Sequence, residues 1–131
     1  MPDGLRAALP KVFLNKAALS ERFFENLFER SPEMRPFFSQ HPGRRKDSFV
    51  TLLTQLALCA EQPDTLELIA QRLYSRNAEL GVQAEHYIEG GTVLKQTLRE
   101  ILGSCLSEKE LAAWDLIVDA LIDRMAALSR Q

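Results

Sequence analysis

The sequence predicts an all-α protein, and three observations lead to this expectation. Most of the chain repeats its apolar residues at intervals of three and four, which places them on one face of a helix. No segment alternates apolar and polar residues with the period of two that an amphipathic strand requires. Capping residues, prolines and glycines separate the apolar stretches. We therefore expect about seven helices in a single domain over residues 1–131.

Composition and charge are typical of a soluble globular domain. Hydrophobic residues make up 46% and charged residues 26% of the chain, and its formal net charge is −2. This balance offers no basic surface for nucleic acid, and no apolar stretch is long enough to span a membrane. Cys59 and Cys105 fall on apolar helical stripes without zinc-binding spacing, so we expect buried, reduced thiols in a cytoplasmic protein.

Four helical segments are predicted in the first half of the chain. They cover about residues 3–14, 15–30, 32–38 and 44–61. Pro10 falls inside the first segment, while Ser31 and Pro32 form the cap and first-turn proline that start the third. Residues 39–43, which include His41, have the proline and glycine content of a loop.

Three longer helices are predicted in the second half. The first begins near Asp64, and Gly81 suits its C-terminal cap. The second carries its apolar stripe from Tyr87 to Cys105. Ser107 and its neighbours have the spacing of a capping box that opens the last helix.

The last helix has an apolar stripe widened by Leu116, Ile117 and Ile122, so we expect it to lie deep in the core. The predicted helices are short and interrupted at the start of the chain, and two long helices close it after a middle pair. This order suits a helical sandwich better than a four-helix bundle.

Three segments of the sequence resemble bacterial globins, in particular single-domain haemoglobins and the globin half of flavohaemoglobins. They are residues 23–28 followed by 31–38, residues 81–82 with 85–87 and 94–98, and residues 112–114 together with Met125. The resemblance extends over about residues 5–128. It implies a globin-like fold, in which helices surround a haem-sized pocket.

The resemblance also implies where pocket residues lie. Phe38 matches the phenylalanine that packs on the haem, and Phe24 stands where many bacterial globins have an oxygen-binding tyrosine. Arg45, or else Arg44, falls near the distal position that usually carries glutamine or histidine. Tyr87 matches a tyrosine near the proximal side. The full set expected at the pocket is Phe24, Phe38, Arg45, Phe49, Leu73, Asn77 and Tyr87.

Asn77 occupies the position of the proximal histidine. Relatives have that histidine four residues before a Gly-Val pair and ten residues before the tyrosine, and counting back from Gly81 and from Tyr87 gives Asn77 both times. Asn77 also continues the apolar stripe that contains Leu73, so it should point inward. A carboxamide is a poor donor to iron, which proteins hold by imidazole, thiolate, thioether or phenolate groups.

Other iron ligands are conceivable, and each has a simpler interpretation. His41 could reach the iron from the distal side, or it could be a solvated loop residue. Tyr74, three residues before Asn77, could turn partly into the site or pack in the core. His86 is expected to be a polar residue at a helix start, and Cys59 should lie beyond the pocket.

Two functions stay open. The first is a degenerate globin that holds no haem through a proximal histidine, similar to the haem-free globin domains of bacterial stress-signalling proteins. Such a binding or signalling module would have an empty pocket or one filled by an apolar or amphipathic molecule, for example a fatty acid whose head group binds Arg45. The second is a haem protein for gas binding, haem transport or peroxidase-like chemistry, with His41, Tyr74 or water on the iron.

A nitric oxide dioxygenase is a third, less favoured possibility. That reaction needs histidine-ligated iron and an electron source, and we expect neither a proximal histidine at position 77 nor a flavin or nicotinamide domain after Gln131. We therefore expect no such activity. By analogy with other globins, a homodimer through the last two helices is plausible, and no nucleic-acid or membrane partner is expected.

Overall fold

The structure is a computed structural model that describes residues 3–38, 42–59, 62, 64–78 and 81–130. These residues form seven α-helices and one 3₁₀ helix, and no strand occurs among them. The elements are α1 (Asp3–Ala7), α2 (Leu9–Leu14), α3 (Lys16–Arg30), η1 (Pro32–Phe38), α4 (Pro42–Leu58), α5 (Asp64–Ala78), α6 (Ala84–Leu102) and α7 (Glu108–Ser129). The all-α prediction is confirmed.

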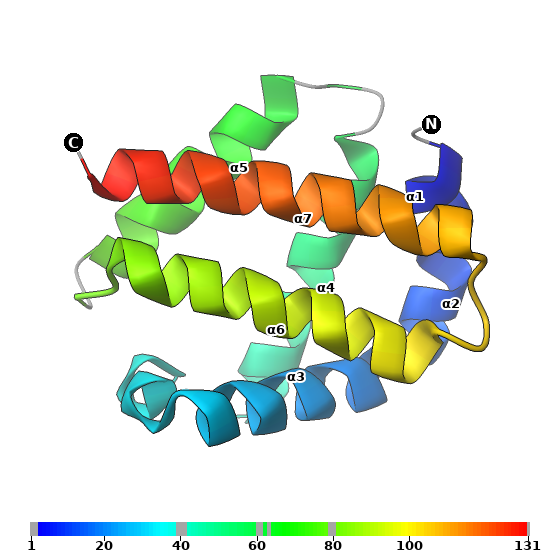
Figure 1. The fold of residues 1–131 in the computed structure, drawn as a ribbon, viewed down its shortest axis with the longest axis horizontal. Helices are drawn as coiled ribbons and strands as arrows, with labels where there is room; N and C mark the ends of the chain where they lie inside the picture. Colours follow the sequence, from blue (N-terminus) through cyan, green and yellow to red (C-terminus); the bar gives the residue numbers. More distant parts are fainter. Residues whose placement is uncertain (1–2, 39–41, 60–61, 63, 79–80, 131) are drawn as a thin grey trace.

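The two longest helices, α6 and α7, run antiparallel to each other across one face of the molecule (Figure 1). Helix α3 packs against α6, and α5 packs against α7. Helix α4 crosses behind the α6–α7 pair and contacts α3, while α1 packs against α7 and α4 (Figure 1). Because these helices pack around one another, side chains from α3, α4, α5, α6 and α7 can line one cavity between them. None of the described helices is both long and apolar enough to cross a membrane.

The core is centred on the inner faces of α6 and α7. Trp114 is completely buried there, and its indole N–H has no hydrogen-bond partner among the described residues. The expectation that Leu116 widens the buried stripe is wrong, because its side chain is 71% exposed. Two residues along a helix correspond to a rotation of about 200°, so Leu116 faces away from the side on which Trp114 is buried.

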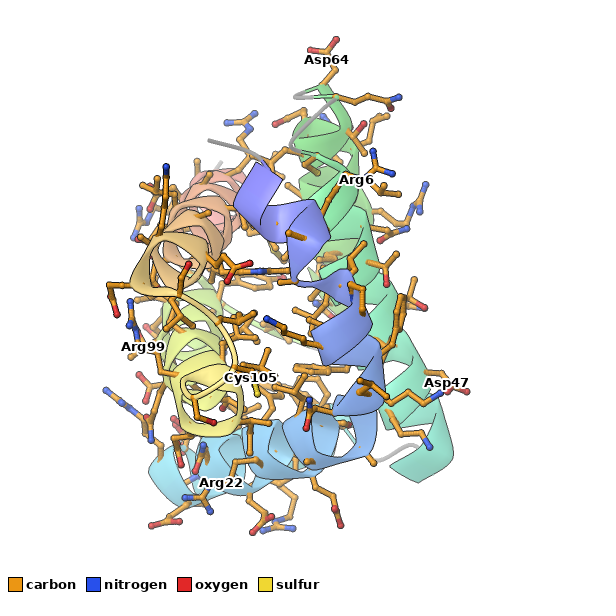
Figure 2. All side chains as sticks on the ribbon, turned by 90° about the vertical axis from the view of Figure 1, so that its right-hand side faces the viewer. Arg6, Arg22, Asp47, Asp64, Arg99 and Cys105 are labelled. Atoms are coloured by element: carbon orange, nitrogen blue, oxygen red, sulfur yellow. The ribbon has the colours of Figure 1, made fainter. Side chains whose placement is uncertain are left out.

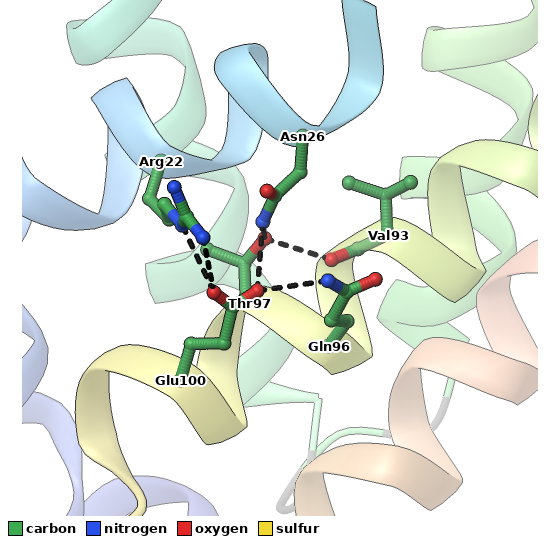
Figure 3. Close-up of polar contacts among 6 residues, drawn as sticks. All are labelled: Arg22, Asn26, Val93, Gln96, Thr97 and Glu100. Atoms are coloured by element: carbon green, nitrogen blue, oxygen red, sulfur yellow. Dashed lines mark hydrogen bonds and ion pairs between the residues drawn. The ribbon is translucent and has the colours of Figure 1, made fainter. Parts of the chain in front are cut away.

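A polar network joins α3 to α6 and extends from the buried Asn26 and Thr97 to the exposed Arg22 and Glu100 (Figure 3). The buried Asn26 side chain donates to Thr97 Oγ1 at 3.2 Å and to Glu100 Oε1 at 2.9 Å. Arg22 donates to the other oxygen of the same carboxylate, at 2.9 Å from its Nε. Because buried polar groups need specific partners, this network fixes the register between the two helices. Both helices contribute residues to the cavity described below.

The predicted helix ends near α6 and α7 agree with the structure. Ser107 and Glu110 form the expected capping box: the Glu110 N–H donates to Ser107 Oγ at 3.1 Å, and Ser107 N–H donates to Glu110 Oε1 at 2.8 Å. Gly81 lies just beyond α5 with a φ of +86°, a conformation that glycine adopts without a Cβ penalty.

Three expectations about the chain are wrong in detail. The first predicted helix divides at Ala8 into α1 and α2, because Pro10 is accommodated in a first helical turn and not in a helix interior. Pro42 and Gly43 belong to α4 and not to a loop. Cys105 is exposed, because α6 ends at Leu102 and the chain leaves the helical phase (Figure 2). Cys59 is buried, as expected.

Candidate functional site

A cavity of about 260 Å³ lies between the helices, and it is lined mainly by apolar side chains. Its walls come from α3, η1, α4, α5, α6 and α7. The described lining residues are Phe23, Phe24, Phe37, Phe38, Ser48, Phe49, Leu52, Leu73, Arg76, Asn77, Gly90, Gly91, Leu94, Val118, Leu121, Ile122 and Met125. Pockets of this kind, apolar with a few polar groups, are the usual sites for small ligands.

One wall is a cluster of phenylalanine rings from α3, η1 and α4. The ring of Phe24 lies 5.0 Å from Phe23, edge to face, and 5.3 Å from Phe38. Phe23 in turn lies 5.0 Å from Phe49 on α4. Aromatic pairs at these distances stabilise each other beyond the area they bury. The cluster therefore presents a rigid, purely apolar surface to the cavity.

A second wall is formed by α6 and α7, which approach each other closely at Gly91. A Cβ atom added to Gly91 would lie 2.5 Å from Ile122 Cγ1, so only glycine permits this packing. At the neighbouring Gly90, an added Cβ would meet no other atom within 4 Å. Gly90 thus leaves open space beside the backbone of α6.

The third wall, on α5, carries the polar groups. Leu73, Arg76 and Asn77 line the cavity from the last turns of this helix. Arg76 is exposed, and its side chain forms no hydrogen bond or ion pair with another residue that the structure describes. The Asn77 side chain lies beside the Tyr87 hydroxyl, so the exposed guanidinium of Arg76 is the donor that this wall offers at the edge of the apolar space.

Asn77 also faces two tyrosines. Burial raises the pKa of Tyr87, the nearby Tyr74 adds to this rise, and the Asn77 side chain opposes it. The Tyr87 hydroxyl is buried, and no described group lies in hydrogen-bonding geometry with it, so Asn77 is near this hydroxyl without a well-formed bond to it. Tyr87 and the half-buried Tyr74 belong to the core and are not among the lining residues.

Five of the seven residues expected at the pocket line one cavity: Phe24, Phe38, Phe49, Leu73 and Asn77. Tyr87 does not line the cavity, and it lies in the core close to Asn77. Arg45 is in the first turn of α4, and its side chain is outside the described part of the structure, as is that of Arg44. His41 also lies outside the described residues.

His86 is held at the start of α6 by its helix cap. The backbone N–H of Gln83 donates to His86 Nδ1 at 2.9 Å, which places the proton of the neutral imidazole on Nε2. Neither ring nitrogen then has a free lone pair for a metal. This agrees with the interpretation of His86 as a helix-start residue. Among the residues described, no group of three or more histidine, cysteine, aspartate or glutamate side chains could hold a metal ion.

Several wall residues were not found from the sequence. Arg76 has no sequence signal beyond being next to Asn77, because an arginine near a helix end is usually solvated. The pair Gly90–Gly91 inside a long helix was a usable signal, since glycine is unfavourable in helix interiors. Ser48 and Phe37 lie one position from Phe49 and Phe38, and periodicity alone did not assign them to the wall.

Comparisons with known proteins agree with this architecture. The globin family model matches residues 21–125. A flavohaemoprotein of Chromobacterium violaceum is 28% identical over 125 residues, which cover 90% of this chain and 31% of that protein. The chain thus spans about a third of the length of the flavohaemoproteins it matches.

Two solved structures share the fold over almost the whole chain. An engineered carbene transferase from Rhodothermus marinus has a TM-score of 0.82 and 29% identity, and the match covers 99% of this chain and 91% of that one. A flavohaemoglobin of Malassezia yamatoensis with bound FAD and haem has a TM-score of 0.80 at 16% identity, covering 98% of this chain and 35% of that one. The resemblance seen in the sequence is confirmed, and the chain belongs to the globin family.

Proposed function

We propose that this chain is a non-enzymatic, ligand-binding globin whose pocket holds a small apolar or amphipathic molecule in place of a haem bonded to a proximal side chain. The observation that carries the proposal is the carboxamide of Asn77 on the α5 wall of the cavity. In the alignment drawn from the sequence, this is where a globin presents its imidazole. A role as a sensor or signalling module follows if ligand binding is passed on to a partner.

The walls of the cavity suit haem, but the donor atoms do not. Haem iron is held by imidazole, thiolate, thioether or phenolate groups. Among the described lining residues, the thioether of Met125 is the one group of these classes. In cytochromes c a methionine accompanies a histidine on the iron, so Met125 does not replace the missing imidazole. The described lining residues therefore offer no side chain that would by itself replace a proximal imidazole on haem iron.

The size of the cavity also favours a ligand smaller than haem. Its volume of about 260 Å³ is slightly below the roughly 300–1,000 Å³ that is usual for ligand pockets. A smaller molecule fits the space between the phenylalanine cluster and Gly90 as it stands.

A haem titration tests the proposal directly. We expect the wild-type protein to show no sharp, intense Soret band with added haem, whereas Asn77→His restores the imidazole and gives a stoichiometric, six- or five-coordinate spectrum. Ser75→His is the matched control, because it puts an imidazole on the exposed side of the same helix. It should behave like the wild type.

The opposite result would support the alternative function. If the wild-type protein takes up stoichiometric haem with a sharp Soret band, the proposal is wrong. A band that is then lost in His41→Ala or Tyr74→Phe would identify the atypical iron ligand. A band that both variants retain would indicate haem held by burial alone, with solvent on the iron.

A further inference from the structure

We propose that His86 is a pH-sensitive latch on this cavity: its neutral imidazole holds Phe37 in the cavity wall, and protonation of the ring loosens that wall and weakens ligand binding. This inference rests on the proposed function, because it assigns a regulation to the same pocket. It follows from the hydrogen bond that caps α6, from the ring contact between His86 and Phe37, and from the place of Phe37 in the wall.

The hydrogen bond at the start of α6 requires a neutral imidazole. The backbone N–H of Gln83 donates to His86 Nδ1 at 2.9 Å. Protonation puts a hydrogen on this nitrogen as well, so that both ring nitrogens become donors. Two donors would then face each other, and the imidazole has to turn away from Gln83. The added positive charge would also lie at the N-terminus of α6, where the helix dipole disfavours cations.

The same imidazole is in contact with the cavity wall. Phe37 of η1 packs edge to face against His86, with 5.2 Å between the ring centroids, and Phe37 lines the cavity. The next residue, Phe38, packs instead against Phe24 and Phe28 of α3, at 5.3 Å and 6.2 Å. One phenylalanine of η1 is thus held by α3, while the orientation of the other depends on the imidazole of α6.

His86 is the described group at this contact whose charge changes between about pH 5 and pH 7.5, since carboxylates stay ionised and arginine stays protonated in that range. The charged residues nearest along the chain on α6, η1 and α3 are Glu85, Glu89, Glu33, Arg35 and Arg30. Arg30 and Glu89 form an ion pair between α3 and α6, and the Arg35 guanidinium lies over an aromatic ring of α3. On α5, Arg76 lines the same cavity. These groups keep their charges, so a change of the wall in this range is assigned to the imidazole.

The expected size of the effect follows from the strength of a helix cap. Loss of a capping hydrogen bond shifts a folding equilibrium by roughly two- to thirtyfold. A ligand that binds the ordered wall better than the loosened one loses affinity when the loosened state becomes populated. We therefore expect protonation of His86 to weaken binding by about threefold or more.

Calorimetric titrations with two neutral probes, naphthalene and decan-1-ol, test the latch at about pH 7.5 and about pH 5. Neither probe changes its charge in this range, and each has on the order of ten heavy atoms, which suits a cavity of about 260 Å³. We expect the wild-type protein to bind the probes at least threefold more weakly at the lower pH.

His86→Gln is the matched variant, because a glutamine at this capping-box position accepts the same backbone N–H at every pH. Its affinity should be equal at the two pH values. His86→Ala removes both the acceptor and the ring, so it should bind weakly at both. His41→Gln replaces the other histidine of the chain and should keep the pH dependence of the wild type.

Nuclear magnetic resonance of the ligand-free protein tests the contact itself. The ring signals of Phe37 should shift with the same midpoint as those of His86 during a pH titration, whereas in His86→Gln they should stay in place. The comparison between wild type and His86→Gln is decisive even where His86→Ala fails to fold.

The outcomes distinguish the latch from the function on which it rests. If the wild-type protein binds the probes equally at both pH values, if His86→Gln keeps the loss at low pH, or if the Phe37 signals do not follow His86, the latch is wrong. The pocket then still binds apolar molecules, and the proposed function stands. If neither probe binds at either pH, both proposals are overturned.

Discussion

Gly91 lies where α6 and α7 come closest, and its replacement by alanine tests the packing behind the cavity. The added Cβ would be 2.5 Å from Ile122 Cγ1 and 3.3 Å from Ile122 Cδ1. A β-branched side chain in a helix has one strongly preferred χ1 rotamer, so Ile122 cannot simply turn away. Overpacking of this kind costs about 1–3 kcal/mol.

The neighbouring glycine provides the reference value. Alanine is better than glycine in a helix interior by about 1 kcal/mol, and at Gly90 this gain is not offset, because nothing lies within 4 Å of an added Cβ. We therefore expect Gly90→Ala to stabilise the protein by about 1 kcal/mol. Gly91→Ala has the same gain in helix propensity, but the clash with Ile122 outweighs it. This variant should therefore lower the free energy of unfolding by roughly 0–2 kcal/mol.

Urea denaturation followed by circular dichroism measures both changes. The two variants should differ by about 1–3 kcal/mol in free energy of unfolding, which corresponds to roughly 3–5 °C in melting temperature per kcal/mol for a chain of this size. In an Ile122→Ala background the clash partner is absent, so Gly91→Ala should become stabilising. Equal stability of Gly90→Ala and Gly91→Ala in the wild-type background would refute the assigned close contact.

Two further predictions concern buried and charged groups. Tyr87→Phe removes a buried hydroxyl without a described partner, so it should raise the free energy of unfolding by about 1 kcal/mol in urea denaturation, and a loss would show that the hydroxyl is bonded. The pKa of Glu100 is lowered, first by the hydrogen bond from Arg22. Its stabilisation is therefore present above the ordinary glutamate value of about 4.3 and is lost as the pH falls through the lowered pKa of the folded state. Glu100→Gln should be less stable than wild type at neutral pH, and the urea midpoints of the two proteins should converge as the pH falls through that lowered pKa.

The fold was predictable from the sequence because its signals are local. The spacing of apolar residues, the capping box at Ser107 and the glycine at position 81 each act within one or two helical turns. The errors arose where a local pattern was compatible with two outcomes. Pro10 and Pro42 each fit a first helical turn as well as a break or a loop, and Leu116 extends an apolar stripe in sequence while facing solvent in the structure.

The candidate site was only partly predictable, because its members come from six elements. Asn77 was placed by counting from Gly81 and Tyr87, and the structure puts it on the cavity wall. The availability of Arg76 depends on which carboxylates lie near it in space, and no sequence spacing contains that information. The close contact at Gly91 depends in the same way on where α7 places Ile122.

The complete burial of Trp114 has a practical consequence for all of these measurements. It is the one tryptophan of the chain, it is 0% exposed, and it is not among the cavity-lining residues. Its emission maximum should therefore be blue-shifted while the helices are assembled and should move to longer wavelength when water reaches the indole. Intrinsic fluorescence thus reports collapse of the helical core from a single position, and a ligand that enters the pocket without loosening α7 leaves that wavelength unchanged.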